Sequence, residues 1–358
     1  MKQKLTIYTI LMCFSLFVKA QDAHFSQFYM TPLLHNPAQI GVFKGSGRAT
    51  ANYRSQWGNI LDKNAFRTVA GSYEAKIQVS KDDYMGISAD VLGDQAGPAN
   101  FSQFQGHIGA SYQKRVSGGG KRGRYKRSRN DQYISAGFQI GVGQYTMDAD
   151  KFWYSSQFDD VRVDVDYNAA SGEATGTYTS NLFANLNAGL MWYAIFDDNK
   201  SLYVGGALNH ANAPTLRFNN NFGSNEVLKW RFVGQIGGEL PFSDELSILP
   251  AFVIQNQGQN QQMMTGAHLR YNAHDWREVA LRAGLWTRIS NFNTDGKHVD
   301  ALIVSSVLEM DKINIGLSYD INVSKLNAVS NYRGAFEISV QYIQSERQRR
   351  NKVICPRF

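Results

Sequence analysis

Alternation of apolar and polar residues with a period of two is the feature that most constrains the fold of this chain. It recurs from residue 46 onward, over segments of roughly ten to fourteen residues. In the segment 181–194, NLFANLNAGLMWYA, Leu186 and Leu190 fall on one face and Asn185 and Asn187 on the other. Because successive side chains of a strand point to opposite sides, this pattern predicts strands with one apolar and one polar face.

Fourteen such segments can be counted, and most are longer than the roughly five to six residues typical of strands in soluble proteins. Long strands with one apolar and one polar face are typical of a transmembrane β-barrel, whose outer face meets lipid. We therefore predict an all-β antiparallel transmembrane barrel over residues 46–344. The predicted strands are 46–56, 65–77, 83–93, 101–116, 131–146, 180–195, 200–212, 226–241, 246–255, 261–271, 276–288, 299–309, 313–322 and 331–343.

The lengths of the connections support this assignment independently. Those after odd-numbered strands are mostly long, such as 147–179 and 213–225, whereas those after even-numbered strands are mostly tight. Outer-membrane barrels have short periplasmic turns and long outer loops, so both chain termini are predicted to face the periplasm.

The first twenty residues have the pattern of a secretory signal. Two lysines precede an apolar run from Leu5 to Val18, and Val18 and Ala20 have the spacing that signal peptidase prefers. The run is too short for a spanning helix, and a lipoprotein signal at Cys13 is the less favoured alternative. Removal of residues 1–20 would leave Cys355 as the one cysteine, either an unpaired thiol or part of an intermolecular disulfide, with no internal disulfide.

Positive charge is concentrated in two short segments. Without residues 1–20 the chain has 34 basic and 30 acidic residues, since three of the 37 basic residues are removed, and the stretch 121–129 alone supplies six. The basic residues of this stretch are Lys121, Arg122, Arg124, Lys126, Arg127 and Arg129. A second group, Arg347, Arg349, Arg350 and Lys352, lies in the segment 345–358, which is predicted to be a periplasmic tail.

Both basic segments are predicted on the periplasmic side. The stretch 121–129 either binds a protein partner or is a solvated loop near anionic lipid or cell-wall material. The tail is either a second periplasmic surface, together with the N-terminal segment, or a frayed terminus. Nucleic acid is not the expected partner, because a secreted location supplies little of it and Tyr125 alone is no base-stacking platform.

Residues 21–45 are too irregular for a barrel strand, with prolines at positions 32 and 37 and several aromatic residues. The aromatic side chains need apolar neighbours. The segment is therefore predicted to be an N-terminal periplasmic element that either plugs the barrel mouth or docks a partner.

Charged residues on the predicted inner faces have both signs, which favours pairing that rigidifies the barrel over a selective channel. They are Glu74, Lys76, Arg231, Glu239, Arg270, Glu278, Arg282 and Glu337. Pro250 lies inside a predicted strand and lacks an N–H, so a β-bulge is expected there.

No cofactor, metal or catalytic site is predicted. Asp159, Asp160, Asp164 and Asp166 cluster in the longest outer loop, but their spacing matches no calcium loop, and a solvated acidic face is favoured. The histidines lack metal-ligand spacing. No GxSxG-type motif supports a lipid hydrolase built on a barrel.

The two ends of the chain carry the most specific motifs. The start QDAHFSQFYMTPLLHNPAQIGVF is followed by NYRSQW, and the chain closes with RGAFEISVQY and CPRF. These motifs resemble those of the PorP/SprF family of the type IX secretion system of Bacteroidetes. The residues that carry the resemblance are Phe25, Ser26, Gln27, Asn36, Pro37, Ala38, Gly41, Tyr53, Arg54, Gln56, Trp57, Cys355, Pro356, Arg357 and Phe358.

The resemblance implies a non-enzymatic integral protein of the outer membrane of a Gram-negative bacterium. Its implied partners are a periplasmic ring containing a lipoprotein, or a secreted surface protein of the gliding-adhesin type that it retains at the cell surface. The alternative is a porin-like channel for small solutes, which the polar inner face alone favours.

Overall fold

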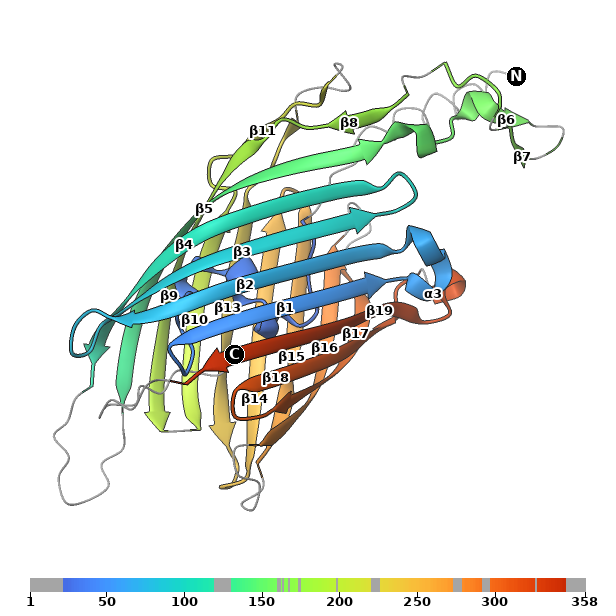
Figure 1. Ribbon diagram of the computed structural model, residues 1–358. Coiled ribbons are helices and arrows are strands. Elements are labelled where there is room, and N and C mark those ends of the chain that lie inside the picture. Colours follow the sequence, from blue (N-terminus) through green and yellow to red (C-terminus); the bar gives the residue numbers. More distant parts are fainter. Residues whose placement is uncertain are drawn as a thin grey trace, which may run out of the picture.

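Fourteen long antiparallel strands form a closed barrel in the computed structural model (Figure 1). The first strand, β1, pairs with the last, β19, and β5 pairs with both β4 and β9, so the sheet closes on itself. Closure leaves no strand edge, which is the condition for a sheet to cross a lipid bilayer. The wall consists of β1 (Gly47–Gln56), β2 (Phe66–Gln78), β3 (Tyr84–Ala96), β4 (Phe101–Ser117), β5 (Asp131–Asp148), β9 (Phe183–Asp197), β10 (Lys200–Asn209), β13 (Arg231–Pro241), β14 (Leu246–Gln257), β15 (Asn260–Tyr271), β16 (Ala280–Asn291), β17 (Lys297–Glu309), β18 (Ile313–Asn322) and β19 (Arg333–Gln344).

The structure describes residues 22–118, 130–159, 162, 164–166, 168–172, 175–197, 199–219, 226–272, 279–291, 297–325 and 327–345. Within these ranges, the helices are all too short or too polar to span a membrane.

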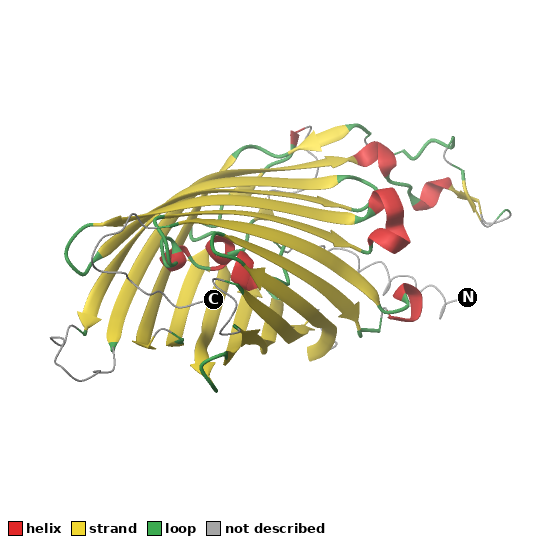
Figure 2. Cartoon of the chain, turned by 60° about the horizontal axis from the view of Figure 1, so that its bottom comes forward, coloured by secondary structure: helices red, strands yellow, loops and turns green. Residues whose placement is uncertain are grey.

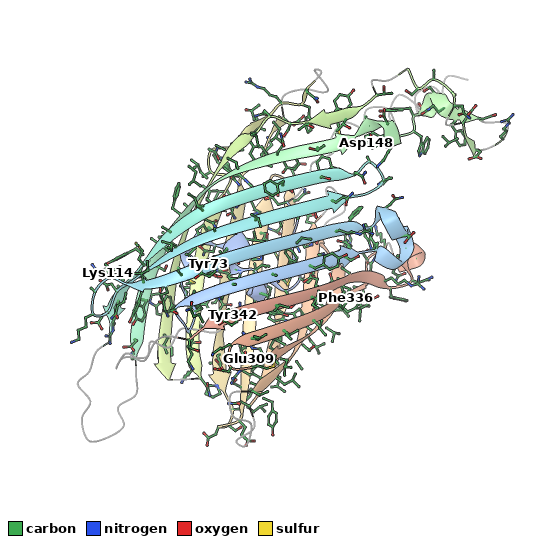
Figure 3. The ribbon with its side chains drawn as sticks, in the orientation of Figure 1. Tyr73, Lys114, Asp148, Glu309, Phe336 and Tyr342 are labelled. Carbon is green, nitrogen blue, oxygen red and sulfur yellow. The ribbon has the colours of Figure 1, made fainter. Side chains whose placement is uncertain are left out.

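The two faces of the wall differ in the way that the alternating pattern predicts. Outward-pointing side chains such as Leu190 and Leu285 are 62% and 70% exposed, whereas inward-pointing Gln139 and Asn185 are buried. Figure 3 shows side chains projecting from the outside of the strands, among them Tyr73, Phe336 and Tyr342. The apolar band therefore surrounds the barrel, where it would contact lipid.

The connections divide the barrel into two ends. At one end, called the turn end, short connections join β2 to β3, β9 to β10, β13 to β14 and β17 to β18. At the other, called the long-loop end, the connection from β5 to β9 contains η4 (Ala149–Lys151), η5 (Ser155–Gln157), β6 (Phe158–Asp159), β7 (Asp164–Val165) and β8 (Thr177–Thr179). The same end carries α3 (Gly58–Leu61), η3 (Asp62–Asn64), β11 (Thr215–Leu216), β12 (Glu226–Val227) and α4 (Asn327–Ser330) (Figure 1).

The structure differs from the sequence-based expectations at two places in the wall. β13 begins at Arg231, and residues 226–227, predicted as its start, pair instead with β11. The bulge expected at Pro250 is absent: β14 keeps its register with both neighbours. The missing N–H is accommodated by a gap in the pairing of β14 with β13, between the pairs Gly237–Ala251 and Leu240–Ile248.

Residues 22–45 lie inside the barrel, as Figure 2 shows for their short helical turns. This segment begins near the long-loop end, where the backbone N–H of Asp22 donates to the side chain of Gln257, the last residue of β14. It leaves the interior at the turn end, where Ser46 bonds the carbonyl of Gln344. The first and last described residues thus lie at opposite ends of the barrel. The chain termini lie outside the described residues, so their periplasmic location stays a prediction.

Candidate functional site

Residues 22–45, called the plug from this point on, fill the interior and form the candidate functional site. Three short turns shape the plug: η1 (Phe28–Met30), α2 (Pro32–His35) and η2 (Pro37–Gln39). Pro32 and Pro37 occupy the first position of a turn, where a missing N–H costs no hydrogen bond within the turn. The side chain of Asn36 accepts a hydrogen bond of 2.9 Å from the N–H of Ala38 and so caps η2.

A buried carboxylate of the wall binds two consecutive backbone amides of the plug. The N–H groups of Ser26 and Gln27 donate to the two oxygens of Glu337, at 2.7 and 2.9 Å. Arg54 pairs with the same carboxylate and donates to Asp320 at 3.1 Å. Glu337 and Asp320 are almost wholly buried, so their charges depend on these partners.

Arg288 completes this group of paired charges around Ser26, which we call the charged cradle. Its Nη1 donates to Asp320 at 2.8 Å and to the hydroxyl of Ser26 at 3.0 Å, and its Nε donates to Asp300 at 2.7 Å. The hydroxyl of Ser26 in turn donates to Asp320 at 2.9 Å. Charged residues of β1, β16, β17, β18 and β19 therefore converge on one serine of the plug.

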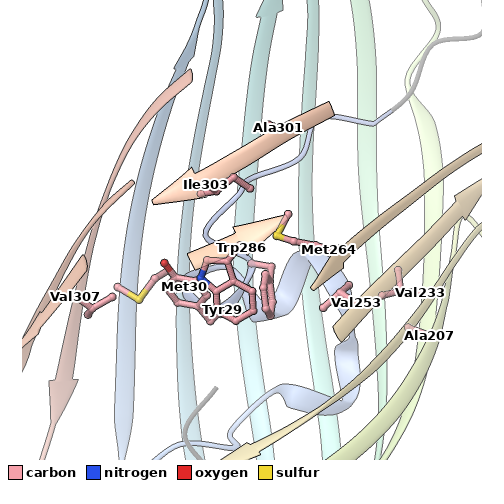
Figure 4. Close-up of a cluster of buried hydrophobic side chains, with 11 residues drawn as sticks. Tyr29, Met30, Ala207, Val233, Val253, Met264, Trp286, Ala301, Ile303 and Val307 are labelled. Atoms are coloured by element: carbon pink, nitrogen blue, oxygen red, sulfur yellow. The ribbon is translucent and has the colours of Figure 1, made fainter. Parts of the chain in front are cut away.

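Aromatic packing holds the next part of the plug against the wall (Figure 4). The ring of Phe28 meets Trp286 edge to face at a centroid distance of 5.2 Å, and Tyr29 meets His268 at 4.5 Å. Met30 packs into the same cluster with Met264 and its neighbours. Burial of such large rings makes a substantial apolar contribution, of about 1.5–3 kcal/mol for each large side chain.

Glycines of the wall make room for the turn at Asn36 and Pro37. A Cβ atom on Gly137 would collide with the carbonyl of Pro37, and one on Gly189 would collide with the side chain of Asn36. Gly137 and Gly189 stand directly opposite each other on β5 and β9. Gly86 gives the same clearance to the carbonyl of Ile40. We call these three residues the glycine seat.

The last part of the plug is anchored near the turn end. The N–H of Gly41 donates to Glu74 at 2.9 Å, and the Nε of Arg48 donates to the same carboxylate at 2.8 Å. Gly41 has a φ of 74°, a left-handed conformation that favours glycine. Lys76 donates to the carbonyl of Phe43 at 2.7 Å, which ends the plug beside the start of β1.

Small cavities lie between the plug and the wall. Two of those lined by described residues have volumes of about 20 and 10 Å³, comparable to the space occupied by a single water. The larger cavity is lined partly by Asp22, His107, Asn185, His210 and Arg231.

The structure brings most of the family-motif residues together. Phe25 packs against Ala70 and Leu92; Ser26, Gln27, Asn36, Pro37 and Gly41 contact the wall as described above. Arg54 lies in the charged cradle, and Gln56 accepts a hydrogen bond of 3.2 Å from it. Tyr53 instead faces outward, and Trp57 lies at the long-loop end, in a left-handed conformation against Phe66.

The other sequence-predicted residues have mixed outcomes. Pairing of inward charges is confirmed for Glu74 with Arg48, Arg231 with Asp22, Arg282 with Glu309, and Glu337 with Arg54. Glu239 lies 4.0 Å from Arg270. The residues that lie outside the described ranges are Lys121, Arg122, Arg124, Lys126, Arg127, Arg129, Asp160, Glu278, Arg347, Arg349, Arg350, Lys352, Cys355, Pro356, Arg357 and Phe358.

Sequence reasoning missed several residues that hold the plug, namely Asp22, Trp286, Asp300 and His210. Each lies at an inward or loop position that alternation marks only as polar or apolar. Their convergence on the plug depends on which strands face each other across the interior. Among the described residues, no group of three or more histidine, cysteine, aspartate or glutamate side chains is placed to hold a metal ion.

Substitution of Gly137 by valine is expected to unseat the plug, because the new side chain would occupy the position of the Pro37 carbonyl. Overpacking of this kind costs about 1–3 kcal/mol or more. The variant should still form a heat-modifiable barrel but should be cut by protease within residues 22–45. The matched control is Gly71→Ala, whose added Cβ would meet Val91 at an ordinary 3.6 Å. Equal protease resistance of wild type and Gly137→Val would contradict the role of the seat.

Substitution of Glu337 by glutamine is expected to destabilise the protein by about 3–5 kcal/mol, since Arg54 and the amides of Ser26 and Gln27 lose their charged acceptor. Urea titrations of refolded protein in detergent measure this difference. Asp311→Asn, at an exposed turn between β17 and β18, serves as the control that removes a carboxylate without changing the cradle. A midpoint shift no larger than that of the control would show that the cradle contributes nothing to stability.

Comparison with solved structures identifies proteins of similar fold. The TodX deltaS2S3 mutant monoaromatic hydrocarbon channel aligns with a TM-score of 0.52 and 11% sequence identity. The alignment covers 88% of this chain and 94% of the TodX chain. The TodX monoaromatic hydrocarbon channel deltaS2 mutant has a TM-score of 0.51 and 12% identity, covering 89% and 94%. The Pseudomonas putida toluene transporter TodX has a TM-score of 0.43 at 12% identity, covering 90% and 94%. At such identities the likeness concerns the fold alone.

No curated protein matches the sequence. The family model described as "Type IX secretion system membrane protein PorP/SprF" matches residues 17–342, nearly the whole of the chain. The matched range includes the motifs at Phe25–Gln27 and Asn36–Ala38, which lie in the plug, and Arg54, which contacts the plug from the wall. The chain belongs to the PorP/SprF family of type IX secretion system membrane proteins.

Proposed function

We propose that this protein is a plugged outer-membrane barrel that serves type IX secretion by binding protein partners, and that it does not conduct small solutes. The observation that carries the proposal is the plug, which runs through the interior from Asp22 to Phe43 with its backbone bonded to the wall. A lumen filled in this way leaves the two mouths and the loops as the surfaces available to partners. Family membership supports the role in type IX secretion.

The turn end is the proposed contact for a periplasmic partner, such as a ring that contains a lipoprotein. In outer-membrane barrels the short turns face the periplasm. The basic stretch 121–129 connects β4 to β5 at this end, and the basic tail follows β19 there. Two dense groups of positive charge on one side of the membrane fit an acidic partner surface.

The long-loop end is the proposed contact for a secreted surface protein. The connection from β5 to β9 carries Phe152, Trp153 and Phe158, which are 40%, 53% and 39% exposed. Trp153 and Phe158 lie with their ring centroids 6.4 Å apart. Exposed aromatic side chains grouped on a projecting loop are typical of protein-binding surfaces. Figure 1 shows this loop extending beyond the rim of the barrel.

Co-purification from native membranes tests the partner role. Replacement of the six basic residues of 121–129 by serine is expected to leave barrel assembly unchanged. It should reduce recovery of periplasmic type IX components about tenfold, because charge complementarity controls such association. The control replaces Arg67, Arg217 and Lys325, exposed basic residues of the long-loop end. Unchanged recovery of the periplasmic components would contradict the proposal for this stretch.

The polar inner face favours a porin-like channel as the second candidate function, and conductance separates the two. Wild-type protein in planar bilayers is expected to be electrically silent, since the plug fills the lumen. Deletion of residues 22–35 removes Ser26, which the charged cradle binds, and the rings of Phe28 and Tyr29, which pack against the wall. The deletion variant should therefore show steady conductance. Steady, solute-selective conductance of the wild type would overturn the plugged-barrel proposal in favour of a channel.

A further inference from the structure

A chain of four hydrogen bonds, called the relay from this point on, links two carboxylates across the interface between plug and wall. Asp90 contacts Nδ1 of His107 at 2.8 Å, and Nε2 of His107 contacts Nδ2 of Asn185 at 3.0 Å. Oδ1 of Asn185 contacts Nδ1 of His210 at 2.8 Å, and Nε2 of His210 contacts Asp22 at 2.6 Å. All five side chains are buried.

The number of hydrogens in the relay follows from its chemistry. Four contacts need four hydrogens, one for each. A carboxylate has none to give, the amide of Asn185 donates one and accepts one, and a neutral imidazole carries a single N–H. The amide and two neutral rings therefore supply three hydrogens, one fewer than the four contacts require.

This shortage does not depend on how the amide of Asn185 is turned. With its NH₂ toward His107, that ring donates to Asp90, and His210 must donate from both nitrogens. With the amide reversed, His210 needs one N–H, and His107 must donate from both. In either case one ring is an imidazolium, or one carboxyl holds the equivalent proton.

The surrounding charges favour the extra proton. Arg231 lies 3.2 Å from Asp22, so two carboxylates, one guanidinium and one extra proton sum to zero. Without that proton the buried cluster would carry an uncompensated negative charge, which is costly away from water. Burial alone would raise the pKa of Asp22, but His210 and Arg231 hold that pKa below its ordinary value.

The other groups that face the relay do not replace this proton. Burial, followed by Arg231, lowers the pKa of His35 in the plug to about 3, so its imidazole is neutral. The side chain of Gln139 donates to Asp90 at 2.9 Å. The side chain of Asn187 accepts a hydrogen bond of 3.0 Å from the backbone N–H of His210, not from its ring. Two further titratable groups interact with the relay. The phenol of Tyr145 interacts with Asp22 and Arg231, and Glu74, whose charge Arg48 balances, interacts with Asp90.

We propose that the relay is a proton-binding site that holds one extra proton and thereby fixes the amino-terminal end of the plug to the wall. The proton is shared along the relay, which runs from Asp90 through His107, Asn185 and His210 to Asp22, the first described residue of the plug. Its loss would leave one of the four contacts without a hydrogen and the cluster negatively charged. The site would then release Asp22 at the long-loop mouth. This inference rests on the plugged interior and is independent of the role in secretion.

Histidine protonation can be counted directly in the intact protein. The chain has seven histidines, and at about pH 8 an unperturbed histidine side chain is mostly neutral. Solid-state NMR of ¹⁵N-histidine-labelled protein in lipid bilayers distinguishes a ring that is protonated at both nitrogens from a neutral one. The expected result for the wild type is one doubly protonated ring or, in protein labelled with ¹³C at the aspartate carboxyl carbons, a carboxylic acid signal from Asp22 or Asp90. Absence of both signals would overturn the proposal.

Two substitutions of Asn185 change the hydrogen count in opposite directions. Asn185→Leu removes the link between the rings, so two neutral imidazoles suffice and the extra-proton signal should disappear. Asn185→Asp places an acceptor between both rings, so two doubly protonated rings are expected. Asn314→Leu, which removes a bond to Gln341 elsewhere in the wall, is the control and should keep one. An unchanged signal in both Asn185 variants would show that the proton belongs to a simple histidine–carboxylate pair and would overturn the relay.

Discussion

Satisfaction of backbone hydrogen bonds in a medium without water is the constraint on which the rest of this structure depends. Every N–H and C=O within a bilayer must find a partner in the protein, and a sheet achieves this only by closing on itself. Here β1 pairs with β19 to complete the ring. Once the ring is closed, alternation divides each strand into a lipid-facing side and an interior side. Because a one-residue slip in strand pairing would move every side chain of a strand to the other face, the register of each strand fixes which of its residues point inward.

Closure creates a second requirement, because the inward side chains enclose a space that they do not fill. The plug fills this space, and the glycine seat allows the backbone of the plug to lie close to the wall. Glycines at Gly86, Gly137 and Gly189 remove side chains where the backbone of the plug touches the wall. Larger residues such as Trp286 pack against the aromatic side chains of the plug. The interior is thus packed like a soluble core even though the protein surrounds a lumen.

Charge governs the same interface, because a buried ion is tolerated only with a partner. Glu337 and Glu74 use backbone amides of the plug as partners in addition to Arg54 and Arg48. Removal of the plug would leave these carboxylates with fewer donors and would admit water to them. The plug and the wall therefore stabilise each other, and the proton held by the relay extends this mutual dependence to Asp22.

The sequence by itself determined the barrel, the number of strands, the two ends with short and long connections, and the inward side of charged residues such as Arg282 and Glu337. These features follow from period-two alternation and turn composition, which are local properties of the chain. It also marked residues 21–45 as irregular and left open whether they plug or dock. Only the tertiary structure decided that Asp22, Ser26 and Gly41 meet side chains up to 311 residues away in sequence. Such contacts depend on strand tilt, register and closure, which bring together residues that no local pattern connects.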